Sequence, residues 1–281
     1  MTAIFPLLAA FLQAGSLTLD KVILSIRGMS YQAYVGLSFP LSFTMAFMVF
    51  LAMRPPLYVA HFVGISGLLL LVAICYSVGV NFIFYRALKY DGLAELETIS
   101  LLAAIPVVLF MGLVFADERN FAVIIPALIA SIAVVWSHWE RRHFHLARRT
   151  LLFLAWVVLA APLSVAVTKL LLSWWHPISL ELVRSGSVAI IFGYLYFRHK
   201  RHIPVYAAPL LLLTNALTTL AGIFILFSYQ RSGVVYTALL FSLQPLLVYG
   251  AAVFFLKEKL LVKKALAFAT VLGSIAMAQV L

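Results

Sequence analysis

The stretch SLTLDKVILS, residues 16–25, places an aspartate and a lysine in a segment that is otherwise almost entirely apolar. A related stretch, SVAVTKLLLS, occurs at residues 164–173. Lys21 and Lys169 occupy the same place in the two stretches, together with matching serines and leucines. A charge that recurs in the same apolar setting indicates that the chain contains a repeat.

A second match follows in the same order along the chain. Tyr90 and Pro106 have the same separation as Tyr229 and Pro245, and an acid-base pair ends the run after each proline. Chance alignment of apolar sequence explains one such match more readily than two in order, so the pattern favours duplication. It predicts three parts: residues 1–138, a basic connecting loop at 139–150, and residues 151–281.

The composition assigns the chain to a membrane. Of 281 residues, 65% are hydrophobic and 10% are charged, and the mean hydropathy is +1.10. One soluble core cannot bury so much apolar sequence, and runs long enough to cross a bilayer as helices recur throughout. The net charge of +11 falls in loops between these runs, which suits lipid contact better than nucleic acid.

Charged and Pro- or Gly-containing segments divide the sequence into predicted transmembrane helices. We expect ten spans, at about 3–26, 31–53, 61–89, 93–116, 120–138, 151–173, 178–197, 204–229, 233–256 and 260–280. Five spans in each half is an odd number, so the second half must enter the membrane from the opposite side. The predicted fold is therefore all-α and integral to the membrane, with two inverted five-helix repeats around a central cavity.

The basic residues are distributed unevenly between the two sides. One side carries most of them, including the loop at 139–149, whereas the other has only Arg54, Arg119 and Arg231. The positive-inside rule makes the richer side cytoplasmic and places both termini outside.

Several motifs resemble a known family. The phrases FYRALKYDGLAELETISLLAAIP (84–106) and FSYQRSGVVYTALLFSLQP (227–245), the two lysines, and the pairs Glu118-Arg119 and Glu258-Lys259 look like the EamA-like branch of the drug/metabolite transporter superfamily. The resemblance covers essentially the whole chain. It departs from the family at Ala14-Gly15, where Trp-Gly is common, and in the acids Glu95 and Glu97.

The resemblance implies ten helices around a cavity, transport of small metabolites, and cytoplasmic termini, which conflicts with the charge count. Family members export amino acids and other metabolites, or exchange phosphorylated and nucleotide-linked sugars. The resemblance also implies a multi-pass protein, for which we expect the bacterial inner membrane.

Charged residues within or near the spans are candidates for the substrate site. Lys21 and Lys169 are either snorkelling anchors or a matched pair of gate charges at opposite mouths of the cavity. Asp20 has no acidic counterpart in the second half; it either pairs with a neighbouring helix or lines the cavity together with Gln13. Arg86 either extends its side chain to the membrane surface or contacts the substrate.

Two further charged pairs have a structural and a functional interpretation. Glu95 and Glu97 open the fourth span, where acids favour a helix N-terminus, but either one, or Asp20, is a candidate for proton coupling. Glu181 and Arg184 can meet on one face of the seventh span. Alternatively, Arg184 binds a carboxylate or phosphate with its planar guanidinium.

Polar residues and prolines inside the spans complete the candidates. Polar side chains avoid hydrocarbon, so they either join helices or line the cavity; they include Asn81, Asn215, Thr218, Tyr236 and Gln244. Pro106 and Pro245 remove backbone donors at matched places and are candidate hinges or tolerated kinks.

The leading functional hypothesis is a secondary active transporter that exports a small polar or amphipathic metabolite, such as an amino acid, with protons as the candidate coupling ion. The alternative within this class is exchange of anionic sugar phosphates or nucleotide sugars. A membrane enzyme acting on lipid-linked substrates is a different class, and the sequence lacks a clustered nucleophile or paired acids for it. We expect no cofactor or metal, because His143 and His145 lack further ligands and no phosphate-binding loop occurs. The expected partners are the metabolite and membrane lipid.

Overall fold

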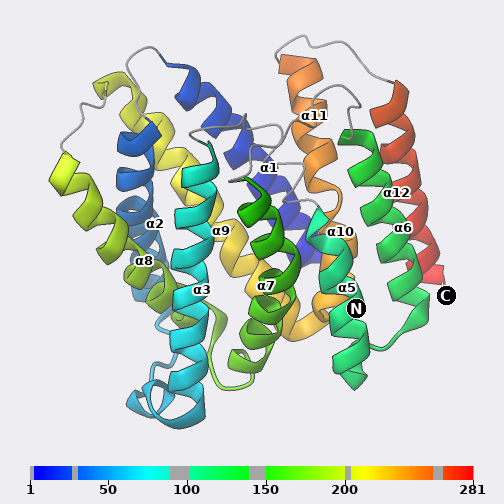
Figure 1. The fold of residues 1–281 in the computed structure, drawn as a ribbon, viewed down its shortest axis with the longest axis horizontal. Coiled ribbons are helices and arrows are strands. Elements are labelled where there is room, and N and C mark those ends of the chain that lie inside the picture. The colour runs from blue at the N-terminus through cyan, green and yellow to red at the C-terminus, as the bar shows by residue number, and fades with distance from the viewer. Residues whose placement is uncertain are drawn as a thin grey trace.

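A computed structural model of the chain describes residues 3–26, 31–88, 102–138, 150–199, 204–255 and 262–280. Every regular element in these ranges is helical, and the longer helices run side by side (Figure 1). The α-helices are α1 (Ile4–Ser25), α2 (Tyr31–Met53), α3 (Gly64–Leu88), α5 (Ala104–Val114), α6 (Phe121–His138), α7 (Thr150–Leu171), α8 (Pro177–His199), α9 (Ala208–Ser232), α10 (Val234–Phe241), α11 (Gln244–Phe255) and α12 (Val262–Val280). Single 3₁₀ turns occupy Val59–Phe62, Ala116–Glu118 and Val205–Ala207.

The all-α class is confirmed, and the predicted spans agree with the described helices to within a few residues. The ninth span differs, because it consists of α10 and α11 separated by a turn at Ser242 and Leu243. The first part of the fourth predicted span lies outside the described residues, and α5 forms its last part.

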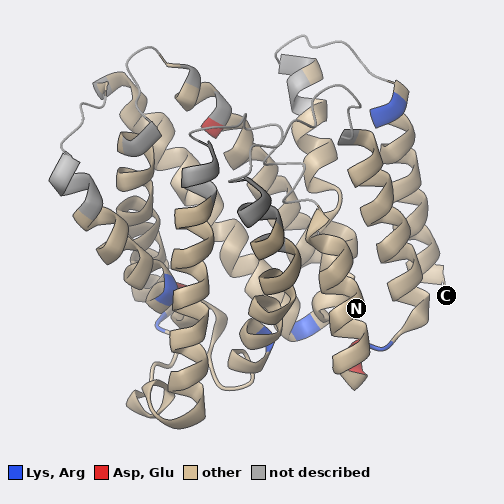
Figure 2. Cartoon of the chain, in the orientation of Figure 1, with Lys and Arg blue, Asp and Glu red and all other residues tan. Residues whose placement is uncertain are grey.

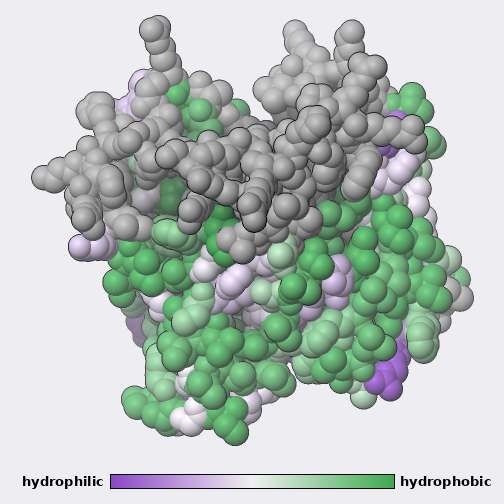
Figure 3. Space-filling view, viewed as in Figure 1, coloured by the Kyte–Doolittle hydropathy of each residue, from purple (hydrophilic) through white to green (hydrophobic). Residues whose placement is uncertain are grey.

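The outer surface is that of a membrane protein. Among the described residues, four helices are long and apolar enough to cross a bilayer, and they lie in Ile4–Leu24, Ala33–Met53, Gly64–Ile83 and Ala208–Ser232. Large apolar side chains such as Leu113, Leu159 and Ile190 are exposed, and hydrophobic atoms cover most of the described face in Figure 3. Lys, Arg, Asp and Glu gather toward the helix ends (Figure 2). Such a surface is stable against hydrocarbon and unstable in water, so the chain is an integral, multi-pass membrane protein.

Helices from the two halves of the chain pack against each other. The main contacts join α2 to α8, α1 to α9, α6 to α12 and α3 to α7. The halves are therefore interleaved rather than side by side, and the space between them lies within the bundle.

Small residues allow these helices to approach closely. A Cβ atom on Gly186 of α8 would lie 3.0 Å from the ring of Phe43 on α2. A Cβ atom on Gly79 of α3 would lie 2.9 Å from Trp156 on α7. Because lipid gives helices little hydrophobic reason to associate, such close van der Waals packing contributes much of the stability.

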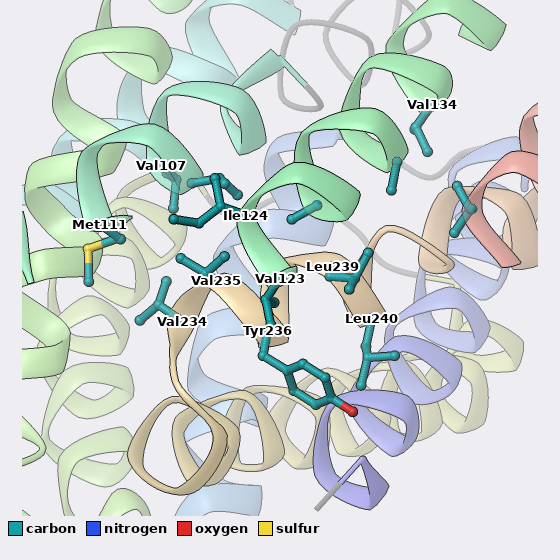
Figure 4. Packing of buried hydrophobic residues seen from close by; sticks show 14 of the residues in the cluster. Val107, Met111, Val123, Ile124, Val134, Val234, Val235, Tyr236, Leu239 and Leu240 are labelled. Atoms are coloured by element: carbon teal, nitrogen blue, oxygen red, sulfur yellow. The ribbon is translucent and has the colours of Figure 1, made fainter. Parts of the chain in front are cut away.

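The largest buried apolar cluster joins α5, α6 and α10. Val234 and Val235 at the start of α10 face Val107, Met111 and Ile124 in Figure 4. Tyr236 is also buried, but its ring points away from the two valines in the same view. This packing holds the short helix α10 of the second half against the last helices of the first.

Candidate functional site

A cavity of about 350 Å³ lies between the two halves. Its walls come from α5, α6, α7, α9, and the α10–α11 segment, and they are lined by Ala103, Ala104, Val107, Ser131, Val134, Ala161, Val165, Ile225, Tyr229, Thr237, Ala238, Phe241, Ser242, Gln244 and Pro245. Most of these side chains are apolar, and hydroxyl and amide groups are spaced among them. Such a lining suits a small molecule with an apolar body and a few polar groups.

The broken ninth span contributes polar groups to the cavity. Because the helix stops after Phe241 and restarts at Gln244, Ser242 and Gln244 lie at the break and line the wall. Pro245 is the second residue of α11, where a missing backbone donor has little cost. Pro245, one of the two candidate hinges, thus lies next to the break between α10 and α11.

A buried carboxylate, Glu118, lies in the 3₁₀ turn that follows α5. Its side chain is 3% exposed. The oxygens accept hydrogen bonds from the backbone N–H groups of Val234, at 2.7 Å, and Val235, at 3.0 Å. Glu118 therefore caps the N-terminus of α10 from the other half of the chain, where the helix dipole favours a negative charge.

Lys169 of α7 pairs with the same carboxylate. Its ammonium donates to Glu118 Oε1 and, at 2.6 Å, to Asp117 Oδ2. It also lies 4.9 Å from the centre of the Phe115 ring. Only 15% of the Lys169 side chain is exposed, so its charge is held by protein groups. We refer to Glu118, Lys169, and the N–H groups of Val234 and Val235 as the Glu118 clasp.

A second polar cluster joins α1, α2 and α9 around Asp20. Asp20 Oδ1 accepts hydrogen bonds from the hydroxyls of Tyr34 and Thr214, each at 2.5 Å. The Ser16 hydroxyl lies 2.9 Å from that of Thr214 and 2.5 Å from that of Thr218. Asp20 and Thr218 thus contribute to the same inter-helix network.

The two asparagine candidates bond within the helical bundle. Asn215 is buried; it accepts a hydrogen bond from Ser42 of α2, at 2.8 Å, and donates to Leu211 of its own helix. Asn81 donates to the carbonyl of Ser77 at 2.7 Å. Gln13 is half-buried on α1.

Arg184 and Glu181 lie on α8 and face α9. A Cβ atom on Gly222 would lie 3.6 Å from the Glu181 carboxylate, so the absence of a side chain there makes room for the acid. Arg184 interacts electrostatically with Glu181 and with Tyr229, which lines the cavity. Its buried Nε has no hydrogen-bond partner within the described part of the chain. A guanidinium with an unused donor is equipped to bind a further acceptor.

Comparison with known proteins identifies the second half of the chain. Residues 148–279 match the model of the EamA-like transporter family. This half is an EamA-like transporter domain. Its helices α7 to α12 carry Lys169, Arg184 and the broken ninth span, and the resemblance drawn from the sequence motifs is confirmed for it. Members of this family are membrane transporters of the drug/metabolite type, and the match covers residues 148–279.

A protein of known crystal structure shares the fold of the whole chain. The superposition covers 99% of this chain and 97% of the other protein, with a TM-score of 0.77 and 14% sequence identity. At this identity the likeness shows the fold alone, which extends beyond the EamA-like domain to the first half. No curated protein matches the chain in sequence.

Four candidates fall outside what the structure describes. Glu95 and Glu97 lie in an undescribed segment, as do the side chains of Lys21 and Arg86, whose backbones belong to α1 and α3. Their assignments remain predictions.

Sequence reasoning missed Glu118 as a site residue. The pair Glu118-Arg119 marks the repeat, but charged residues that follow a span are commonly found at the membrane interface, so the sequence does not identify the pair as a site. A Cβ atom on Gly233 would lie 2.9 Å from Glu118 Oε2, but this closeness exists only in the folded chain and leaves no signal in the sequence. Only the fold of the EamA-like domain against the first half brings these positions together.

Proposed function

We propose that the protein is a secondary active transporter that exports a small polar or amphipathic metabolite by alternating access. In this proposal residues 1–138 and 151–281 form two inverted five-helix halves, joined by the basic segment 139–150. They exchange inward-open and outward-open arrangements around the central cavity, in a bacterial inner membrane.

The observation that carries the proposal is the pattern of helix contacts. If each half repeats the other, α7, α8 and α9 correspond to α1, α2 and α3. The contact of α1 with α9 then has a counterpart in α7 with α3, and that of α2 with α9 in α8 with α3. Likewise α1 contacts α10 and α11, and α7 contacts α5. A packing pattern that survives exchange of the halves supports two related bodies that can swap conformations.

The cavity and the charges near it suggest an amphipathic solute with an anionic group. Ala, Val, Ile and Phe side chains line most of the wall and would contact an apolar body, while Tyr229, Thr237 and Gln244 offer hydrogen bonds. Arg184, beside Tyr229, would bind a carboxylate, and Glu181 would balance an ammonium group. An amino acid or a related zwitterion carries both charges. Lys21, Arg86 and Lys169 remain candidates for further contacts.

Asp20 is the described candidate for proton coupling. It lies between three helices, and its hydrogen-bond partners in the described residues are hydroxyl groups. Hydroxyls can turn to accept a hydrogen bond when the acid is protonated, so the cluster tolerates both states. Glu95 and Glu97 are alternatives for the same role, and Pro106 and Pro245 are candidate hinges.

Counterflow in proteoliposomes tests the transport proposal. Purified protein would be reconstituted with unlabelled solutes from a panel of neutral amino acids, amines, carboxylates and sugar phosphates, and uptake of the labelled counterpart would be measured. We expect exchange of an amphipathic zwitterion, and loss of exchange in Arg184→Ala. Arg231→Ala, which removes an exposed charge at the end of α9, serves as the matched control.

The panel also separates the alternatives. Exchange confined to sugar phosphates would favour the anion exchanger over the zwitterion exporter. Absence of exchange for every solute, in a protein that remains folded, would contradict the transport proposal.

A further inference from the structure

We infer that the Glu118 clasp closes one mouth of the cavity and must break whenever the protein opens to that side. The inference rests on the proposed alternating access and specifies the group that controls it. It requires that the clasp border the cavity, join the two halves, and depend on contacts that can separate.

The clasp lies one helical turn beyond the cavity wall. Val165 and Thr237 line the cavity, and Lys169 and Val234 lie four and three residues away on the same helices. Residues at these separations share a helix face, so the clasp continues the wall toward the helix ends. Its contacts therefore lie where solute would enter or leave.

Within the clasp, one side chain of the first half contacts two elements of the second, and Asp117 adds a further contact to Lys169. Glu118 belongs to the first half, whereas Lys169 and the two N–H groups of α10 belong to the second. One carboxylate thus holds two separate elements, the end of α7 and the start of α10. No opening that moves α5 and α6 away from α7 and α10 can keep all of these contacts.

The contacts also favour two discrete states over a gradual opening. While the mouth is closed, the carboxylate is almost fully buried, and all of its partners are charged or dipolar. Loss of one partner would leave a buried charge poorly compensated, so separation becomes favourable only when water enters and hydrates both sides. Such a cluster is stable when closed and stable when open.

Gly233 provides the space that the clasp needs. Its φ of +86° is in a region that L side chains rarely adopt, and a Cβ atom there would lie 2.9 and 3.0 Å from the two Glu118 oxygens. Gly233→Ala therefore pushes against the clasp without changing any charge.

The repeat supplies a matched pair at the other mouth. By the offsets that relate the halves, Lys21 corresponds to Lys169 and Glu258 to Glu118. Their side chains lie outside the described residues, so the inference depends on Glu118 and Lys169 alone. The pair is still useful as a second set of variants.

Cysteine accessibility tests the clasp without any substrate. Ser131→Cys places a thiol in the cavity wall, and Cys75→Ala removes the native one. A membrane-impermeant maleimide would be added to either face of reconstituted vesicles, and the labelling rate measured. We expect Glu118→Gln and Lys169→Met to raise the rate from the Glu118 face by about fivefold or more, since each removes a cap or an ion-pair partner.

Arg119→Gln is the control, because Arg119 bonds to the carbonyls of Gly112 and Leu113 in its own half. It should leave the labelling rate unchanged. The double variant Glu118→Lys with Lys169→Glu restores the ion pair but not the helix cap, so it should remain accessible. Lys21→Met and Glu258→Gln should raise labelling from the opposite face instead.

If Glu118→Gln does not fold, as judged by gel filtration, Gly233→Ala and Lys169→Met carry the test. Folded variants that label at the parental rate from the Glu118 face would overturn the inference. If the variants label faster but the parent exchanges no solute, the clasp stands and the transport proposal fails.

Discussion

At the scale of single residues, ionisable groups in this bundle are held by partners from distant parts of the chain. Asp20 bonds to side chains of α2 and α9, and Glu118 bonds to α7 and α10. In hydrocarbon an unpaired charge is costly, so each of these groups contributes to helix packing as well as to any role in transport.

The two functions of Asp20 can be separated by substitution. Both hydrogen bonds reach Oδ1, which asparagine retains, so Asp20→Asn should unfold at nearly the parental temperature. Asp20→Ala loses both and should lower the free energy of unfolding by about 2 kcal/mol, at about 1 kcal/mol each. If Asp20 couples protons, Asp20→Asn should still exchange solute but lose its response to a pH gradient. An unaltered response would assign coupling elsewhere.

His176, in the turn between α7 and α8, makes stability depend on pH. Burial and, secondarily, the positive charge of Arg231 lower the pKa of His176 below its usual 6.5. Below that value the unfolded chain binds a proton that the folded chain resists, so stability is full above 6.5 and decreases as the pH falls toward the lowered pKa.

Thermal unfolding in detergent between about pH 8 and pH 5 would measure this effect. His176→Gln should show a smaller decrease in Tm over this interval than the parent. An equal decrease in both proteins would assign the pH dependence to other groups.

At the scale of elements, the ninth span is the unusual one, because it is divided into α10 and α11. The N-terminus of α10 is capped by Glu118, and the break exposes Ser242 and Gln244 to the cavity. A helix broken in this way presents backbone and side-chain polar groups to a solute while remaining shielded from lipid.

Two glycines of this span should respond differently to alanine. Gly233→Ala forces an unfavourable φ and crowds the Glu118 carboxylate, so we expect a loss of about 1–3 kcal/mol. Gly250 lies inside α11 with no atom within 4 Å of its Cβ position, and Gly250→Ala should be neutral or stabilise by about 0.5–1 kcal/mol. Thermal unfolding of both variants in one detergent checks the difference. Equal Tm values would show that Gly233 is not constrained.

At the scale of the whole molecule, the two halves hold each other together. α1 packs on α9 and α3 on α7, so neither half of the chain buries its inner surface alone. If transport requires the halves to move relative to one another, a covalent link between α1 and α9 should stop it.

A disulfide can supply this link. The hydroxyls of Ser16 and Thr214 lie 2.9 Å apart, close enough for Ser16→Cys with Thr214→Cys to form a disulfide in the Cys75→Ala background. We expect oxidation to abolish solute exchange and reduction to restore it. Each single cysteine variant is the control. Unimpaired exchange by the cross-linked protein would mean that α1 and α9 move as one body.

The sequence by itself determined the class of the protein and the bounds of most helices. Each crossing needs about 20 apolar residues, so the spans can be counted from the apolar runs along the sequence. The second span, for example, is predicted at 31–53 and is α2 (Tyr31–Met53) in the structure. The motifs at 227–245 and the acid-base pairs also pointed to the family of the EamA-like domain.

Only the tertiary structure decided which residues meet. Helices that are apolar on every side carry little information about which face is buried, so the pattern of α2 or α9 does not name its neighbours. Glu118 and Val234 are far apart in sequence, and neither position predicts the other. Their contact exists because α10 packs on α5 and α6, and that arrangement follows from the shapes of many small and branched side chains together.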